Sequence, residues 1–138
     1  MTTERTWGPR EEYASLEERR RRLRADRERV QAVLDREQGL LEGILLHSPH
    51  GIVVCDAQGA FLLENEAARR IWAGSAPAKT IDDWARYRAF HADGRPYAGR
   101  DWAMARCMRE MRATEPEEIH FQRFDDSHGV LLASSTPI

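Results

Sequence analysis

The sequence lacks the motifs by which many enzymes are recognised. It has no glycine-rich phosphate loop, no Cys-x-x-Cys pair, no Gly-x-Ser-x-Gly turn and no His-Glu-x-x-His metal motif. These patterns supply a phosphate cradle, a thiol pair, a nucleophilic serine and a catalytic zinc. Glu64 and Glu66, the carboxylates most like an acid and base pair, flank a strand end, where capping or solvent contact is the expected role. We therefore predict no catalytic residues.

Long apolar runs are also missing. The longest nearly apolar stretch covers only 40–46, whereas a helix that crosses a bilayer needs about 20 such residues. Residues 1–9 do not resemble a signal peptide. With only Cys55 and Cys107 there is no disulfide framework, and both are expected as free thiols. We predict a cytoplasmic protein that inserts into no membrane.

Neither sign of charge dominates. The 138 residues carry 21 basic and 23 acidic side chains, a formal net charge of -2, and 41% of them are apolar, enough for one core. Four arginines at 19–22 invite a nucleic-acid interpretation. However, nine arginines and seven acidic residues are mixed over 1–30, and glutamates precede Arg21 and Arg22 by four residues, a spacing that stabilises a helix. We expect a solvated helix and no nucleic-acid partner.

A long helix is expected over residues 10–47, after a disordered tail at 1–9. Pro9 suits the first turn, and Glu11 and Glu12 favour the positive end of the helix dipole. Apolar residues recur at heptad spacing, in a seam that is narrow up to about position 30 and wider after it. This pattern predicts a helix that pairs with a second copy at its start and packs on its own domain at its end. The expected homodimer residues are Leu16, Leu23, Val30, Val33, Leu34, Leu40, Leu41 and Ile44.

A hairpin and a short helix are expected within residues 51–71. Short apolar runs at 52–55 and 61–63 flank Asp56-Ala57-Gln58-Gly59, which has the composition of a tight turn. Asn65 then stands where it can cap a helix that ends near position 72.

Later residues predict more helix and a second hairpin. Thr80 is placed to cap a short helix, and Met104, Cys107, Met108 and Met111 form the apolar face of a helix over 99–113. Two strands follow at 118–124 and 130–136. Four strands and several helices over 48–138 predict an α+β fold, with an antiparallel sheet whose one face the helices cover.

The order of these pieces resembles the PAS sensory domain of bacterial sensor histidine kinases. The likeness rests on the strand, Asp-x-x-Gly turn and second strand, on Asn65 followed by Ala-Ala-Arg-Arg-Ile, and on Phe90 to Tyr97 before the helix at Trp102. It covers about 46–138. The family has five strands, and its last strand lies centrally between the two hairpins. The resemblance therefore implies that this last strand is missing here.

The resemblance also implies a ligand cavity between the sheet and the helices. Methionine side chains adapt to ligands but are equally ordinary core filler. His120, in mid-strand, is either a ligand contact or an unremarkable histidine. The residues expected to line the cavity are Val54, Leu62, Trp72, Trp84, Met104, Cys107, Met108, Met111, His120 and Leu132.

No cofactor is required by the sequence. The family's flavin-reactive motif Asn-Cys-Arg-Phe is absent, and the 99–113 helix has no histidine of the kind that haem-binding relatives use. His47 and His50 are spaced like metal ligands near Cys55, but no acidic residue or second cysteine is close in sequence, so turn histidines are expected. We predict no metal site.

Three functions remain open at this point. The first is a cytoplasmic signal-transduction module, as in two-component systems, that dimerises and relays a ligand or partner signal to an output domain outside this chain. The second is a ligand-free module for dimerisation and protein docking. The third is a thiol redox sensor that uses Cys107.

Overall fold

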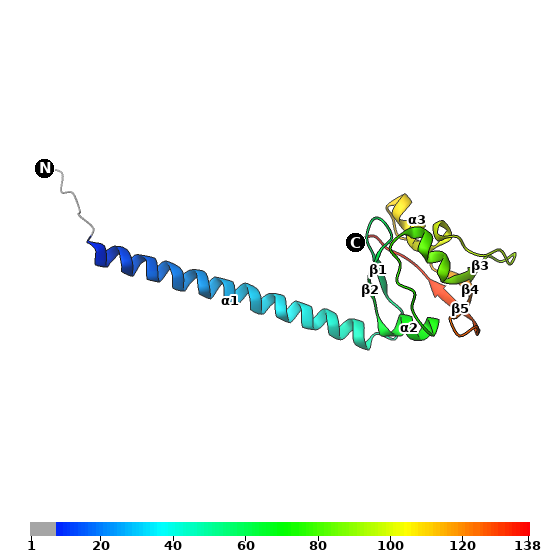
Figure 1. Cartoon of the computed structure of the whole chain (residues 1–138), viewed down its shortest axis with the longest axis horizontal. Coiled ribbons are helices and arrows are strands. Elements are labelled where there is room, and N and C mark those ends of the chain that lie inside the picture. Colours follow the sequence, from blue (N-terminus) through cyan, green and yellow to red (C-terminus); the bar gives the residue numbers. More distant parts are fainter. Residues whose placement is uncertain (1–7) are drawn as a thin grey trace. The chain divides into compact units, whose positions relative to one another are not determined.

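A computed structural model describes residues 8–138 of the chain (Figure 1). It divides between Ile44 and Leu45 into two compact units. The first unit is a long helix, and the second combines short helices with small antiparallel sheets. The predicted α+β class with a long N-terminal helix is therefore confirmed. Residues 1–7 of the expected tail lie outside the described residues, and Pro9 is already the first residue of the helix.

Helix α1 (Pro9–His47) is 39 residues long and buries none of them. Glu18 and Arg22, four residues apart, form an ion pair at 2.6 Å, as expected for a solvated helix face. All eight residues of the predicted dimer seam are exposed, by 50% to 65%. Most helices in proteins are stabilised by packing of an apolar face, and among residues 8–138 no residue of this seam is buried.

The second unit begins with the predicted hairpin. Strands β1 (Val53–Cys55) and β2 (Phe61–Glu64) pair antiparallel. In the turn between them, the Asp56 carboxylate accepts hydrogen bonds from the N–H groups of Gln58 at 2.9 Å and Ala60 at 3.0 Å. The turn therefore forms where its Asp and Gly residues predict it.

Asn65 joins three parts of the second unit. Its Oδ1 caps α2 (Glu66–Trp72) by accepting from the Ala68 N–H at 3.0 Å, and it also accepts from the Ile52 N–H at 2.9 Å. Its Nδ2 donates to the carbonyls of His50 at 2.9 Å and Leu45 at 3.3 Å. The predicted cap is confirmed, and the same buried amide also ties the end of α1 to the start of β1.

The expected helix over 99–113 is broken at both ends. A 3-10 turn, η2 (Gly99–Asp101), precedes α3 (Ala103–Glu110), because Trp102 takes an extended conformation with ψ 145°. Met111 ends α3 in the left-handed region with φ 52°. Gly99 is required here, since a Cβ on it would lie 2.0 Å from the Ile81 carbonyl oxygen of η1 (Ile81–Arg86).

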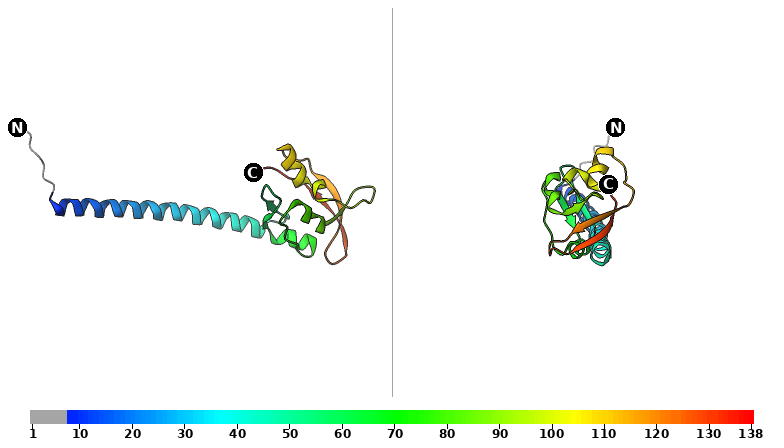
Figure 2. Two further views of the ribbon diagram at one scale, coloured as in Figure 1. Left: turned by 45° about the horizontal axis from the view of Figure 1, so that its top comes forward. Right: turned by 90° about the vertical axis from the view of Figure 1, so that its right-hand side faces the viewer.

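Residues 8–138 contain five strands where four were predicted. The unpredicted strand, β3 (Arg88–Phe90), pairs with β4 (Glu117–Gln122), and β4 pairs with β5 (His128–Ala133). The strands form two sheets, β1-β2 and β3-β4-β5, and not one. Figure 2 shows β4 and β5 as a continuous ribbon in orange and red. The fifth and last strand, β5, forms one edge of the second sheet beside β4, so the expectation that a fifth strand is missing was wrong.

Aromatic side chains form the core of the second unit. Trp72 of α2 lies edge-on to Phe121 of β4 and to Tyr87, with ring centres 4.6 and 4.9 Å apart. Ile119 and Phe121 are only 1% exposed, so one face of β4 is fully covered. A second cluster surrounds Trp84, whose indole Nε1 donates to the Gly59 carbonyl at 2.8 Å.

Candidate functional site

The predicted cavity residues divide between the inside and the outside of the second unit. Trp72, Trp84 and Cys107 are buried. Met104 and Met108 pack, partly buried, against the Trp84 cluster. The helix side of the predicted cavity is therefore occupied by closely packed side chains. Val54, the remaining predicted cavity residue on the inside, is half-buried.

Four predicted cavity residues point outward, and their assignment was wrong. Leu62, Leu132 and Met111 are 67%, 73% and 75% exposed, and the side chain of His120 is 66% exposed. Side chains alternate across a strand, so the inward positions on β4 are those of Ile119 and Phe121, not that of His120. Leu62 of β2 and Leu132 of β5 lie at outward positions of their strands. Met111 follows the last residue of α3, so the helical spacing does not extend to it.

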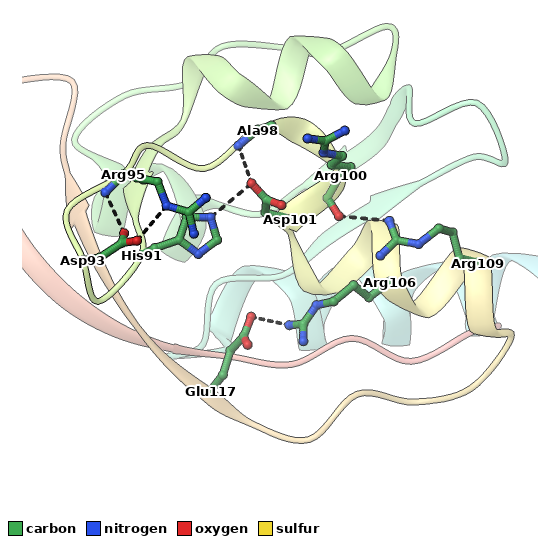
Figure 3. A network of polar contacts seen from close by, with 9 residues as sticks. All are labelled: His91, Asp93, Arg95, Ala98, Arg100, Asp101, Arg106, Arg109 and Glu117. Atoms are coloured by element: carbon green, nitrogen blue, oxygen red, sulfur yellow. Dashed lines mark hydrogen bonds and ion pairs between the residues drawn. The ribbon is translucent and has the colours of Figure 1, made fainter.

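A polar network links α3 to β4 and to the segment before α3 (Figure 3). Arg106 of α3 reaches across to the carboxylate of Glu117, the first residue of β4, and forms an ion pair with it. Arg109 donates to the Arg100 carbonyl at 3.0 Å. The ion pair joins two elements that the sequence separates by six residues of loop.

Asp101 organises the loop between β3 and α3. Its carboxylate accepts from the Ala98 N–H at 2.7 Å and lies 3.2 Å from the His91 Nε2 (Figure 3). The Ala98 hydrogen bond is the main reason why the pKa of Asp101 lies below its ordinary value, and His91 lowers it further. At the tip of the loop, the Asp93 carboxylate accepts from Arg95 Nε at 2.7 Å.

An open groove of about 750 Å³ runs between this loop and the outer face of the sheet. Its chemistry is mixed, because aromatic rings and imidazoles line it together with one carboxylate. His120 belongs to this groove and not to the interior. The groove is lined by Phe90, His91, Ala92, Gly94, Tyr97, Glu118, His120 and His128.

Two buried donors near the network have no acceptor among the described residues. They are the indole Nε1 of Trp102 and the Nε of Arg106. A buried donor without a partner costs about 1–3 kcal/mol, and most buried donors in folded proteins pair with a protein group or with ordered water. Tyr97 lies beside them, with its ring centre 5.3 Å from that of Trp102. Burial raises the pKa of Tyr97, and the Glu117 carboxylate adds to the rise.

A second buried polar group is fully paired. The Tyr87 hydroxyl donates to Glu64 at 3.0 Å and accepts from the Ala76 N–H at 3.1 Å. Ser75 donates to the other oxygen of the same carboxylate. Burial raises the pKa of Tyr87. Because each atom has its partner, these residues act as a structural joint between β2 and the loop after α2.

The two cysteines are poorly placed for reaction with solvent oxidants. Cys107 is buried, at 3% exposure, and Cys55 is partly buried. Burial raises the pKa of the Cys55 thiol, and the nearby Asp56 carboxylate and Cys107 raise it further. A raised pKa disfavours the thiolate, which is the reactive form.

Within residues 8–138, no three His, Cys, Asp or Glu side chains are grouped so as to hold a metal ion. His47, His50 and Cys55 are among the residues searched, and they form no such group. Among the same residues, no helix is long and apolar enough to cross a membrane. Comparison of the chain with protein-family models, with curated proteins and with solved structures finds no match.

The most informative residues of the site were not in the predicted set. Arg106 and Glu117 were overlooked because their contact joins a helix to the following strand across a six-residue loop, which no local sequence pattern indicates. Ile119 and Phe121 carried a usable signal: they are the large apolar residues of β4, and they flank His120. Assigning the larger pair to the core would have placed His120 outside.

Proposed function

We propose that this chain is a PAS-like sensory module that dimerises through α1 and relays a signal to an output domain outside the chain, in the cytoplasm. The observation that carries the proposal is the exposed apolar seam of α1. Eight apolar residues at heptad spacing on a helix that buries nothing are typical of a helix that pairs with a second copy. A dimer of such helices transmits a signal when its two arrangements differ in affinity for the ligand or partner.

The strand pairing supports the PAS-like interpretation of the second unit. A hairpin, a helical crossover and a second hairpin follow one another along the chain. The inner strands of the two hairpins, β1 and β5, each have a partner on one side only. The family to which the chain bears a resemblance also has five strands, with its last strand placed centrally, and β5 is the fifth and last strand of residues 8–138.

A ligand-free docking module is the second candidate. It is favoured by the close packing of the aromatic core, where Trp84, Ile119 and Phe121 are less than 2% exposed. Native mass spectrometry of the freshly purified chain separates the two candidates. A dimer that retains a small molecule supports the sensor. A protein that is fully dimeric and carries no small molecule supports docking alone. The thiol sensor is the weakest candidate, since Cys107 is buried.

Sedimentation equilibrium tests the dimer. The double variant Val33→Asp/Leu40→Asp places two carboxylates in the seam of each helix, so the dissociation constant should rise at least about 100-fold. The matched control is Gln31→Asp/Gln38→Asp, which adds the same charge two residues earlier in each heptad, outside the seam. Equal dissociation constants for both double variants would show that α1 does not pair through these residues.

A further inference from the structure

The open groove between the β3–α3 loop and the sheet carries charge of one sign along its walls. Its volume of about 750 Å³ lies within the range of small-molecule sites. With histidine counted as neutral at pH 7, Glu118 is the only charged residue among those of 8–138 that line the groove, and the lining includes no lysine or arginine of this part of the chain. The walls therefore present one negative charge to a ligand.

The Glu118 carboxylate has no firm partner among residues 8–138. Its side chain is 71% exposed, and the one basic group near it is the His120 Nε2, at 4.0 Å. That distance is longer than a hydrogen bond. Asp93, at the tip of the neighbouring loop, differs in this respect because it accepts from Arg95 Nε at 2.7 Å. A ligand in the groove therefore meets a carboxylate that no arginine neutralises.

The cationic groups beside the groove are neutralised by partners of their own. Arg88, at the start of β3, lies 3.0 Å from the Asp126 carboxylate. The His91 Nε2 lies 3.2 Å from Asp101 (Figure 3), so that carboxylate would balance a proton on the imidazole. An anion in the groove would meet the Glu118 carboxylate, and like charges at short range repel. The charges of the groove therefore favour a cation.

Aromatic rings supply a second feature that favours a cation. Phe90 and Tyr97 line the groove together with the imidazoles. The centre of the Tyr97 ring lies 4.4 Å from that of His91 and 5.3 Å from that of Trp102, so the ring is held in place before any ligand arrives. Phe90 lies directly opposite His120 in the pairing of β3 with β4. The negative faces of aromatic rings attract ammonium groups and do not attract carboxylates.

We propose that this groove binds a small organic cation, either a quaternary ammonium or a protonated amine. Glu118 lies opposite the charge, and the rings of Phe90 and Tyr97 pack against the carbon atoms bonded to the nitrogen. The site goes beyond the proposed function, because it belongs to the second unit alone and does not require the pairing of α1. It is also separate from the interior of that unit, where Met104 and Met108 pack against the Trp84 cluster.

The test titrates the full 138-residue chain with cations and with uncharged and anionic probes of matching shape. The cations are choline and benzylamine. In 3,3-dimethylbutanol a carbon replaces the nitrogen of choline, and 3,3-dimethylbutyrate carries the same branched group as an anion. The backbone N–H signals of Gly94 and His120, which line the groove, report binding in a proton–nitrogen correlation spectrum. Low salt is used because salt screens exposed charges.

We expect at least one of the two cations to move both signals in a saturable way. The uncharged alcohol should bind at least about ten-fold more weakly than choline, because it loses both the attraction to the rings and the attraction to the carboxylate. The anion should not bind, since it has the same sign of charge as the Glu118 side chain.

Variants assign the binding to the groove. Glu118→Gln removes the charge and keeps the shape, and Phe90→Leu removes a ring. Each should weaken cation binding by about three- to five-fold, and Glu118→Gln, at an exposed position, decides the result if Phe90→Leu does not fold. The matched controls are Glu115→Gln and Tyr13→Leu, which change an exposed carboxylate and an exposed ring outside the groove and should keep the wild-type affinity.

Three results would overturn the inference. The first is a pair of groove signals that neither cation moves. The second is an alcohol or an anion that binds as tightly as choline. The third is cation binding that both groove variants retain at the wild-type affinity. Sedimentation of the same samples keeps the two proposals apart: a dimer that binds no cation removes this inference alone, and a monomer that binds a cation removes the dimer alone.

Discussion

At the scale of single residues, Asn65 is the side chain whose loss should cost most. Its buried amide makes four hydrogen bonds to backbone groups of α1, α2 and the segment before β1. Asn65→Ala leaves those groups without this partner, so we expect the free energy of unfolding to fall by about 2–4 kcal/mol. Urea denaturation followed by tryptophan fluorescence measures it. Asn65→Asp keeps the acceptor and loses the donor, so its stability should lie between those of the alanine variant and the wild type.

Asp101 should make the stability of the second unit depend on acidic pH. Its pKa is lowered in the folded chain, chiefly by the Ala98 N–H. Its contribution is therefore complete above the unfolded value of about 3.9 and is lost as pH falls through the lower folded value. The wild type should be more stable than Asp101→Asn at neutral pH, and the gap should close below about pH 4.

Urea midpoints measured from neutral to acidic pH check this prediction. Asp82→Asn is the control, because Asp82 is an exposed aspartate of η1 that neither caps the loop nor faces His91. A gap between wild type and Asp101→Asn that stays constant down to the acid transition would contradict the assigned role.

At the scale of elements, replacement of glycine by alanine should lower stability at Gly99 of η2 and raise it at Gly39 of α1. A Cβ on Gly99 would lie 2.0 Å from the Ile81 carbonyl oxygen, so Gly99→Ala must push η2 away from η1 and should cost about 1–3 kcal/mol. Gly39 of α1 has open space around its Cα, so Gly39→Ala should stabilise the helix by about 1 kcal/mol. Thermal unfolding followed by circular dichroism measures both. An unchanged melting temperature for Gly99→Ala would contradict the close contact.

Elements set by local hydrogen bonds were predictable from the sequence. The turn at Asp56 and the cap at Asn65 depend on side chains that bond backbone groups two to four residues away. Most of helix α1 follows in the same way from the run of helix-forming residues before Gly39 and from its acidic first turn. In each case the residue and its partner are close together in the chain.

Elements set by distant contacts were not predictable. Strand β3 has only three residues, Arg88–Phe90, and exists because it pairs with β4 some 30 positions later. The inward face of β4 and the Arg106–Glu117 pair likewise depend on how separate elements pack. The sequence showed that aromatic and methionine residues gather in the second unit. It did not show which strand faces would receive them.

At the scale of the whole molecule, the proposed dimer makes the stability of α1 depend on protein concentration. A helix that buries nothing within one chain gains its packing from the second copy, so mass action applies. A hundred-fold rise in concentration should stabilise the dimer by about 2.7 kcal/mol. The helical signal of the full chain should therefore melt at a higher temperature when the protein is concentrated. The Val33→Asp/Leu40→Asp variant should show no such dependence.

The Asn65 amide has a mechanical consequence for the chain. Its Nδ2 donates to the carbonyl of Leu45, in the last turn of α1. Its Oδ1 accepts from the N–H groups of Ile52, just before β1, and Ala68, in the first turn of α2. A shift or rotation of that last turn therefore strains a bond whose other end is anchored in the hairpin. Movement of Leu45 is therefore passed to Ile52, the residue before β1, and to the first turn of α2 through a single side chain.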